Sequence, residues 1–257
     1  MNLKGNLRHS VSFWCFQPYY SLEEFCPIVK EIGLQSIELT GPDEWPILQK
    51  HGLTCAIAQG SFMKLEEGFN DPQNHPWLHK GYESFIPLAA EHGLPHVICF
   101  SGNRNGLSDE TAIENFAQGI DPLVKLAEKH GITLVSELLN SRVDHPDFHC
   151  DHSDFGVKLI EKVGSPNLKL LYDIYHMQIM EGDIIATIRK CAPYIAHYHT
   201  AGVPGRHEIE DDQELNYPAI MRTIVATGYK GFIGQEFVPT RPDPVESLRE
   251  AVRICDV

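Results

Sequence analysis

Three carboxylates and one imidazole stand at the ends of four successive apolar segments in this chain of 257 residues. The segments ITLVSE, LKLLYD, YIAHYH and GFIGQE close on Glu137, Asp173, His199 and Glu236. Each segment has the branched and aromatic residues of a buried strand, and its charge appears only where the strand ends. Side chains at the ends of neighbouring parallel strands meet on one face. Acidic groups that face each other repel or stay protonated unless a cation lies among them, so the pattern predicts a divalent-metal site.

The ligand types narrow the choice of ion. Carboxylate oxygens with a single imidazole suit one Mg²⁺, Mn²⁺ or Co²⁺ ion, with Zn²⁺ as an alternative. No cysteine lies near the ends of these strands, which argues against a structural zinc site.

Strand-like and helical segments alternate along the whole chain in eight units, without a linker or a break in composition. The expected strands are 9–16, 36–40, 53–60, 95–102, 132–140, 168–173, 194–202 and 231–239. Eight parallel strands with right-handed crossovers predict a single (β/α)8 TIM barrel domain over residues 1–257. An open doubly wound sheet is the alternative, but the first strand–helix turn, FQPYYS, lacks a glycine-rich phosphate loop. In such a barrel the active site lies at the carboxyl ends of the strands, where the four candidate ligands fall.

Composition excludes several classes of protein. A formal net charge of −14 argues against a nucleic-acid or anionic-membrane surface, because phosphate binding needs clustered lysine and arginine. No apolar run approaches the length of a membrane span, and the N-terminal segment has no secretory signal. The seven cysteines are scattered, without a CxxC pair, which fits a reducing compartment. We therefore expect a cytoplasmic enzyme with a small-molecule substrate, and a homo-oligomer stays open.

Other polar residues fall near the same strand ends. His176 lies three residues after Asp173, close enough in sequence to reach the same barrel mouth. Arg206 lies in the loop TAGVPGRHE, where its planar fork would suit a substrate carboxylate. Glu208 follows it and would contact substrate, orient Arg206 or lie in solvent. Glu38 ends the second expected strand, where it would lie behind the ligands or contact substrate.

Three aromatic residues and one histidine-rich segment each allow a functional and a structural interpretation. Trp14, Phe16 and Trp45 lie near strand ends and would either wall a pocket or pack in the core. The segment HPDFHCDHSD (145–154) has several potential ligands, but their spacing matches no compact metal site, so we expect a polar loop there.

Three motifs together resemble a known family. YDIYHMQ (172–178), HYHTAGVPGRHE (197–208) followed by ELNY (214–217), and GQEF (234–237) are similar to segments of the hydroxypyruvate isomerases, within the xylose isomerase-like barrel superfamily. The resemblance covers nearly the whole chain and is strongest from Glu137 onward. It implies one divalent metal held by Glu137, Asp173, His199 and Glu236, with substrate contacts from His176 and Arg206.

The resemblance implies an aldose–ketose type isomerase. Its favoured reaction would convert hydroxypyruvate to 2-hydroxy-3-oxopropanoate (tartronate semialdehyde) through a metal-bound enediolate. Glu137 and Glu236 would move the proton between adjacent carbons, and Arg206, His176 and Glu208 would bind substrate.

Three departures bear on the alternatives. His199 stands where many hydroxypyruvate isomerases have glutamine and where ketose 3-epimerases have histidine. Val143 stands where those epimerases have a further glutamate. The DNA-repair nucleases of the superfamily need histidines at the ends AIAQG and CFSGN, which have none. A ketose 3-epimerase or another small-sugar isomerase therefore stays the first alternative, and a non-catalytic metal-binding or sugar-binding barrel the second.

Overall fold

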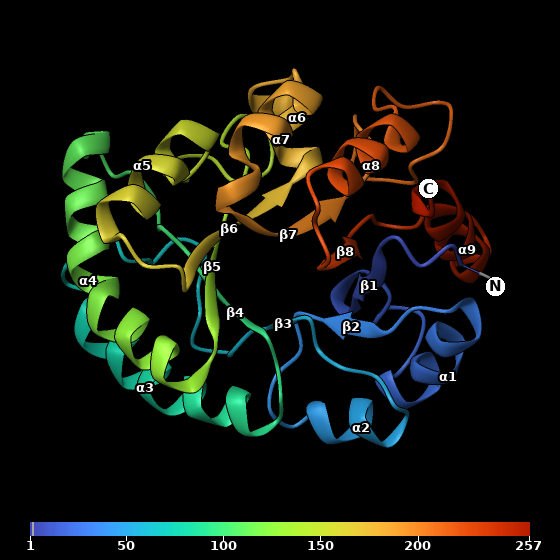
Figure 1. Cartoon of the computed structure of the whole chain (residues 1–257), viewed down its shortest axis with the longest axis horizontal. Coiled ribbons are helices and arrows are strands. Elements are labelled where there is room, and N and C mark those ends of the chain that lie inside the picture. Colours follow the sequence, from blue (N-terminus) through green and yellow to red (C-terminus); the bar gives the residue numbers. More distant parts are fainter. Residues whose placement is uncertain (2) are drawn as a thin grey trace.

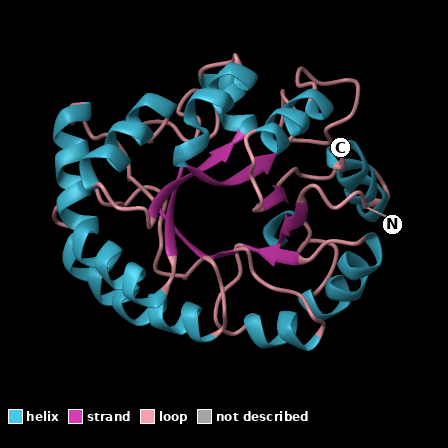
Figure 2. Cartoon of the chain, in the orientation of Figure 1, coloured by secondary structure: helices cyan, strands magenta, loops and turns pink. Residues whose placement is uncertain are grey.

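A ring of helices surrounds a barrel of eight parallel strands in the computed structural model, which describes residues 1 and 3–257 (Figures 1 and 2). The strands are β1 (Arg8–Ser12), β2 (Ser36–Glu38), β3 (Ile57–Ala58), β4 (His96–Cys99), β5 (Thr133–Glu137), β6 (Leu168–Asp173), β7 (Ile195–Thr200) and β8 (Phe232–Gln235). The helices are α1 (Leu22–Ile32), α2 (Trp45–Lys50), α3 (His75–Glu91), α4 (Asp109–His130), α5 (Ser153–Val163), α6 (Ile174–Met180), α7 (Ile184–Cys191), α8 (Tyr217–Ala226) and α9 (Pro244–Cys255). Short 3₁₀ turns follow β1 (Phe13–Cys15) and α7 (Ala192–Tyr194).

The sheet closes on itself. Its strand order is β2-β1-β8-β7-β6-β5-β4-β3, and every pair is parallel. The first and last strands in this order, β2 and β3, meet through parallel bridges between Ser36 and Thr54 and between Thr40 and Ala58. The predicted (β/α)8 TIM barrel is therefore confirmed. The strand order places β1, from the start of the chain, beside β8 from its end, with β2 on the other side of β1.

Local signals account for several helix ends. Ser21 and Glu24 form a capping box at the start of α1, and Ser108 accepts a hydrogen bond from the backbone of Thr111 at the start of α4. Helix α4 ends at Gly131, whose left-handed backbone (φ 69°) terminates the helix without a Cβ penalty.

Residues 174–192, which follow β6, do not form one continuous helix. They divide into α6 and α7 because Gly182 and Asp183 both adopt a left-handed backbone, with φ of 67° and 44°. At its other end, α6 follows β6 directly: Asp173 caps the helix by accepting a hydrogen bond from the backbone of His176, which holds His176 at the barrel mouth.

No helix in the described part of the chain is long and apolar enough to cross a membrane. All seven cysteines are buried and unpaired, and they pack as small apolar side chains.

Candidate active site

The four predicted metal ligands come together at the carboxyl end of the barrel. Glu137 and Asp173 are the last residues of β5 and β6, His199 lies near the end of β7, and Glu236 directly follows β8. Strand register puts Asp173 beside His199, and His199 beside Gly234. One potential ligand atom from each of the four side chains lies within 4.8 Å of the others, and all four residues are buried. The structure thus brings the four side chains into one cluster; their role as metal ligands stays a prediction.

The charges of this cluster fit a cation. Burial raises the pKa of Asp173 to about 7, against the pull of Arg206, and the carboxylates of Glu236 and Glu137 raise it further. Burial also raises the pKa of Glu137. Neither Glu137 Oε1 nor His199 Nδ1 has a hydrogen-bond partner among the described residues, although Nδ1 lies 3.4 Å from Glu137 Oε1 and 2.8 Å from Glu236 Oε2. Potential ligand atoms that face one another without hydrogen-bond partners are suited to bind a divalent ion.

Glu236 is the most strongly held of the three carboxylates. Trp14 Nε1 donates a hydrogen bond to its Oε1 at 2.7 Å, and Arg206 Nη2 donates to its Oε2 at 2.7 Å. Burial opposes ionisation, but His199 and Arg206 outweigh it and hold the pKa of Glu236 well below its usual range. The sequence left the role of Trp14 open between pocket and core, and the structure places it at the pocket.

Replacing Trp14 by phenylalanine should slow turnover by about 10- to 100-fold, because a hydrogen bond to a charged group contributes about 1.5–3 kcal/mol. The ring would still fill the pocket wall, so the loss isolates the bond to Glu236. Steady-state kcat and the melting temperature check the prediction: an unchanged kcat would contradict it.

Arg206 is delivered by a tight turn after β7. The backbone of Gly202 pairs with that of His207, and Arg206 itself has a left-handed backbone with φ of 61°. Its carbonyl accepts a hydrogen bond from the backbone of Val238, at 2.7 Å. The guanidinium lies 5.1 Å from the ring centroid of Trp14, in contact range for a cation on an aromatic face. Its Nε has no hydrogen-bond partner among the described residues, which leaves a donor for a substrate.

The hydrogen-bond partners of Glu208 lie outside the cluster that Arg206 contacts. Its carboxylate accepts hydrogen bonds from Ser247, from the hydroxyl and backbone of Thr240, and from the backbone of Arg241. Substrate contact by Glu208 stays a prediction, and these bonds favour a role in holding the β7–α8 loop against the segment after β8.

Glu208→Gln should lower the free energy of unfolding by about 1–3 kcal/mol, because the side chain loses its charge and its new NH2 group faces donors that the carboxylate had accepted from. Burial opposes ionisation, but the bonds from Thr240 and Ser247 lower the pKa of Glu208 to about 2. Since its folded pKa is below the unfolded value, its stabilisation is present above about pH 4.5 and is lost as pH falls toward 2. Unfolding curves of wild type and variant between pH 7 and pH 3 should therefore converge; parallel curves would refute this.

His176 presents one defined nitrogen to the cluster. Its Nδ1 accepts a hydrogen bond from the backbone N–H of Asn140 at 3.1 Å, so the neutral ring carries its proton on Nε2. Burial holds its pKa well below the usual range, and neighbouring Arg206 adds to that shift. Nε2 has no hydrogen-bond partner in the described chain and lies 3.6 Å from Asp173 Oδ2. The ring is therefore a neutral hydrogen-bond donor at the cluster, in the position that the sequence predicted.

A pocket of about 320 Å³ opens onto the cluster. Its lining includes the following residues: Trp14, Leu39, Gln59, Leu65, Ile98, Phe100, Glu137, Leu139, His145, Arg206 and Glu236. Most of this lining is apolar, and its charged members are Glu137, Glu236 and Arg206, which contacts Glu236. Phe16 and Trp45 are fully buried in the core, where packing explains them.

Two polar residues near the site were not assigned from sequence. His145, from the segment 145–154, lines the pocket, and its ring lies 5.4 Å from that of His176. Asn140 fixes His176 through its backbone. Both lie in the loop after β5. No rule of local sequence spacing predicts which residue of such a loop will contact a side chain that follows the next strand.

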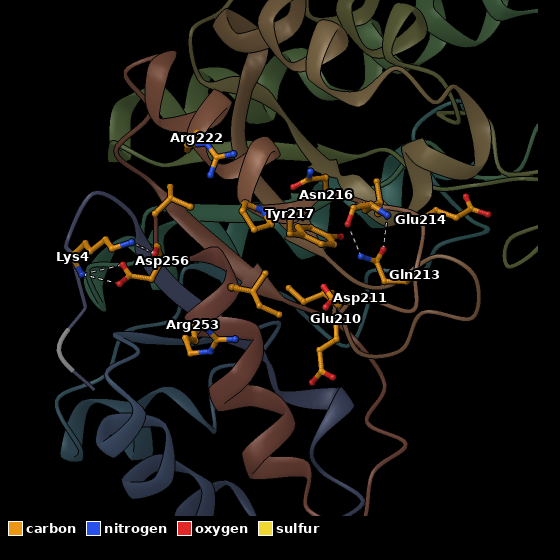
Figure 3. A pocket seen from close by; sticks show the side chains of 15 residues that line it. Lys4, Glu210, Asp211, Gln213, Glu214, Asn216, Tyr217, Arg222, Arg253 and Asp256 are labelled. Carbon is orange, nitrogen blue, oxygen red and sulfur yellow. Dashed lines mark hydrogen bonds between the residues drawn. The ribbon is translucent and has the colours of Figure 1, made fainter.

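A larger surface hollow, of about 690 Å³, lies between the β7–α8 loop, α8 and the end of α9 (Figure 3). Lys4 lines it, and its backbone donates to the carboxylate of Asp256 at 3.0 and 2.9 Å. None of the four clustered ligands is among the described residues that line this hollow, so size alone does not mark the reaction site.

Comparison with known proteins agrees with the architecture and the motifs. Residues 26–256 match the model of the family described as xylose isomerase-like TIM barrel. The hydroxypyruvate isomerase of Escherichia coli (strain K12) is 33% identical over 225 residues, which are 86% of this chain and 80% of that protein. A human protein named putative hydroxypyruvate isomerase is 31% identical over 182 residues, 69% of this chain. The matched region spans 65% of that human protein, somewhat under two thirds of its length.

A solved structure has the same fold over nearly its whole length. The crystal structure of an AP endonuclease, family 2, from Brucella melitensis superposes with a TM-score of 0.84 at 25% identity, covering 94% of this chain and 96% of that one. From its family match and its relatives, this chain belongs to the xylose isomerase-like TIM barrel family and, within it, is an enzyme of the hydroxypyruvate isomerase group.

Proposed function

We propose that this enzyme interconverts hydroxypyruvate and 2-hydroxy-3-oxopropanoate by moving a proton between adjacent carbons. One observation supports the proposal above all: three buried carboxylates and His199 converge at the end of a pocket of about 320 Å³ that also holds Arg206. The names of the relatives from Escherichia coli and human agree with this reaction.

The residues that would hold the metal are Glu137, Asp173, His199 and Glu236. When bound there, a divalent cation would polarise the substrate carbonyl and offset the negative charge that develops as the proton leaves. The buried carboxylates suit such an ion because their own cation, Arg206, contacts only Glu236 closely.

The two glutamates differ in their readiness to take up a proton. The raised pKa of Glu137 brings its carboxyl nearer to neutral pH, whereas Glu236 is held ionised by Arg206 and His199. Titratable pairs whose environments push their pKa values apart are typical of acid–base sites. In the direction from hydroxypyruvate, one glutamate would remove a proton from C3 and the other would return one to C2, while the proton of the C3 hydroxyl moves to the oxygen on C2.

His176 and Arg206 would hold the substrate. The Nε2–H of His176 is positioned to donate a hydrogen bond to the reacting oxygen, since its Nδ1 is already an acceptor for Asn140. The free Nε of Arg206 would donate to the substrate carboxylate.

Arg206→Ala should lower kcat/KM for hydroxypyruvate by about 10- to 100-fold, the loss expected for a hydrogen bond to a charged group. Because Arg206 also contacts Glu236, isomerisation of a neutral substrate such as glyceraldehyde is the control and should fall less. Equal losses for both substrates would assign Arg206 to Glu236 alone and remove its carboxylate role.

The proposal as a whole is tested by substrate choice. The Mn²⁺-loaded enzyme is offered hydroxypyruvate and a panel of ketoses in heavy water, and deuterium uptake is followed. Conversion of hydroxypyruvate with deuterium at carbon supports the proposal. Conversion of ketoses alone would move the enzyme to the epimerase alternative, and no exchange with any substrate would favour a non-catalytic barrel.

A further inference from the structure

A fourth carboxylate lies beside the candidate metal site and does not belong to the lining of the pocket. Glu38, at the end of β2, is fully buried, and its Oε1 lies 2.8 Å from His199 Nε2. The same oxygen lies 3.1 Å from Nε2 of His197, two residues earlier on β7. All three side chains are inside the barrel with no exposed area. None of the three is among the described residues that line the pocket, so a direct contact of Glu38 with substrate is not supported.

The barrel has a space built for this carboxylate. In the sheet order, β1 and β8 lie between β2, which carries Glu38, and β7, which carries His199. The side chain of Glu38 must therefore cross the barrel interior over the position of Gly234 on β8. A Cβ atom at Gly234 would lie only 1.9 Å from Glu38 Oε1 and 2.8 Å from Cδ2 of His199. Glycine at this position is what lets the two side chains meet.

The contact determines which nitrogen of His199 can bind a metal. A carboxylate accepts only, so Nε2 must carry a proton to bond with Glu38. Nδ1 is the nitrogen that faces Glu137, Asp173 and Glu236, so it is the one whose lone pair would bind a metal there once its proton is displaced. Nδ1 is also the nitrogen without a hydrogen-bond partner in the described structure.

We propose that Glu38 is a positioning residue, which holds His199 with Nε2 protonated and Nδ1 directed at the metal. The inference rests on the metal site of the proposed function and goes beyond it. A carboxylate on the far nitrogen orients a ligating histidine and makes it a stronger ligand, and loss of such a partner typically weakens metal affinity about 10- to 100-fold.

The first experiment measures metal affinity. The Zn²⁺ dissociation constants of metal-stripped wild type and Glu38→Gln are compared by competition with a chromophoric chelator, and the visible spectra of the Co²⁺ forms are recorded. Glutamine keeps the size of the side chain and removes its charge. We expect affinity to fall about 10- to 100-fold and the Co²⁺ bands to shift.

Tyr82→Phe is the matched control. Tyr82 is also buried, and its hydroxyl donates to the carbonyl of Ile98 at 2.8 Å, so this variant loses a buried hydrogen bond without touching a ligand. Its affinity and Co²⁺ spectrum should equal those of wild type. Equal affinity of Glu38→Gln and wild type would overturn the proposal, as would equal losses in both variants.

A second measurement needs no change at Glu38. In the Zn²⁺ form labelled with ¹⁵N-histidine, the ring of His199, assigned by its absence in His199→Gln, should show an exchange-protected Nε2–H proton and a metal-bound Nδ1. A proton on Nδ1 and metal on Nε2 would overturn the proposal.

Metal stoichiometry separates the remaining cases. Glu38, His197 and His199 are themselves close enough to hold an ion. Uptake of two equivalents by wild type, with one lost in Glu38→Gln, would make Glu38 a ligand and overturn its positioning role. Absence of any metal uptake by wild type would overturn the proposed function and this inference together, whereas one equivalent with unchanged affinity in Glu38→Gln would overturn this inference alone.

Discussion

Glu236→Gln should reduce kcat for hydroxypyruvate by about 10²–10⁴-fold or more, because positioned acid–base catalysis contributes that much on its own. Glutamine is nearly isosteric and can still accept the hydrogen bond from Trp14, so the fold should stay intact. What disappears is the negative charge that faces Arg206 and His199. The measurements are kcat, deuterium exchange at the substrate carbon and the circular dichroism spectrum.

The control for this variant is Glu83→Gln, which makes the same chemical change at an exposed position on α3 and should leave kcat unaltered. If Glu236→Gln loses turnover but keeps deuterium exchange, the residue acts in one proton transfer and not in the other. Substantial turnover in the variant would remove Glu236 from the catalytic pair.

Removal of divalent metal by a chelator should abolish turnover, and addition of Mg²⁺, Mn²⁺ or Co²⁺ should restore it. The physical reason is the uncompensated charge of the cluster, where burial and like charges raise the pKa of Asp173 to about 7. A ligand that binds only the folded state at 100 times its dissociation constant stabilises the protein by about 2.7 kcal/mol. For a chain of this size that corresponds to an increase in melting temperature of about 5–10 °C.

The metal prediction is checked by activity and thermal unfolding of stripped and reloaded protein. Asp173→Asn is the control, because it removes one ligand charge and should lose most of the metal-dependent increase in melting temperature. Full activity of the stripped protein would contradict the prediction. An increase in melting temperature of equal size in Asp173→Asn would place the metal elsewhere in the protein.

The sequence by itself determined the barrel and the main members of the cluster. Parallel strands with helical crossovers have all their carboxyl ends on one face, so residues at the ends of ITLVSE, LKLLYD, YIAHYH and GFIGQE had to converge once the strands were neighbours. The place of His176 followed for the same reason, because it lies in the first turn of the helix that continues directly from β6. The pattern of apolar residues in a strand and the position of a residue at its end can both be read from the local sequence. They are enough to predict which side chains lie at the carboxyl end of the barrel.

Only the tertiary structure decided what surrounds the cluster. Trp14 and Glu236 are hydrogen-bonded across 222 positions of sequence, because the sheet order sets β1 next to β8. Glu38 and His199 are hydrogen-bonded across 161 positions, because their side chains meet inside the barrel over β1 and β8. The direction of Glu208, toward Thr240 and not toward the pocket, likewise depends on how two loops pack. Sequence spacing predicts the edge of the sheet at which a side chain lies, but whether it reaches a partner depends on sheet order and on the space left by residues such as Gly234.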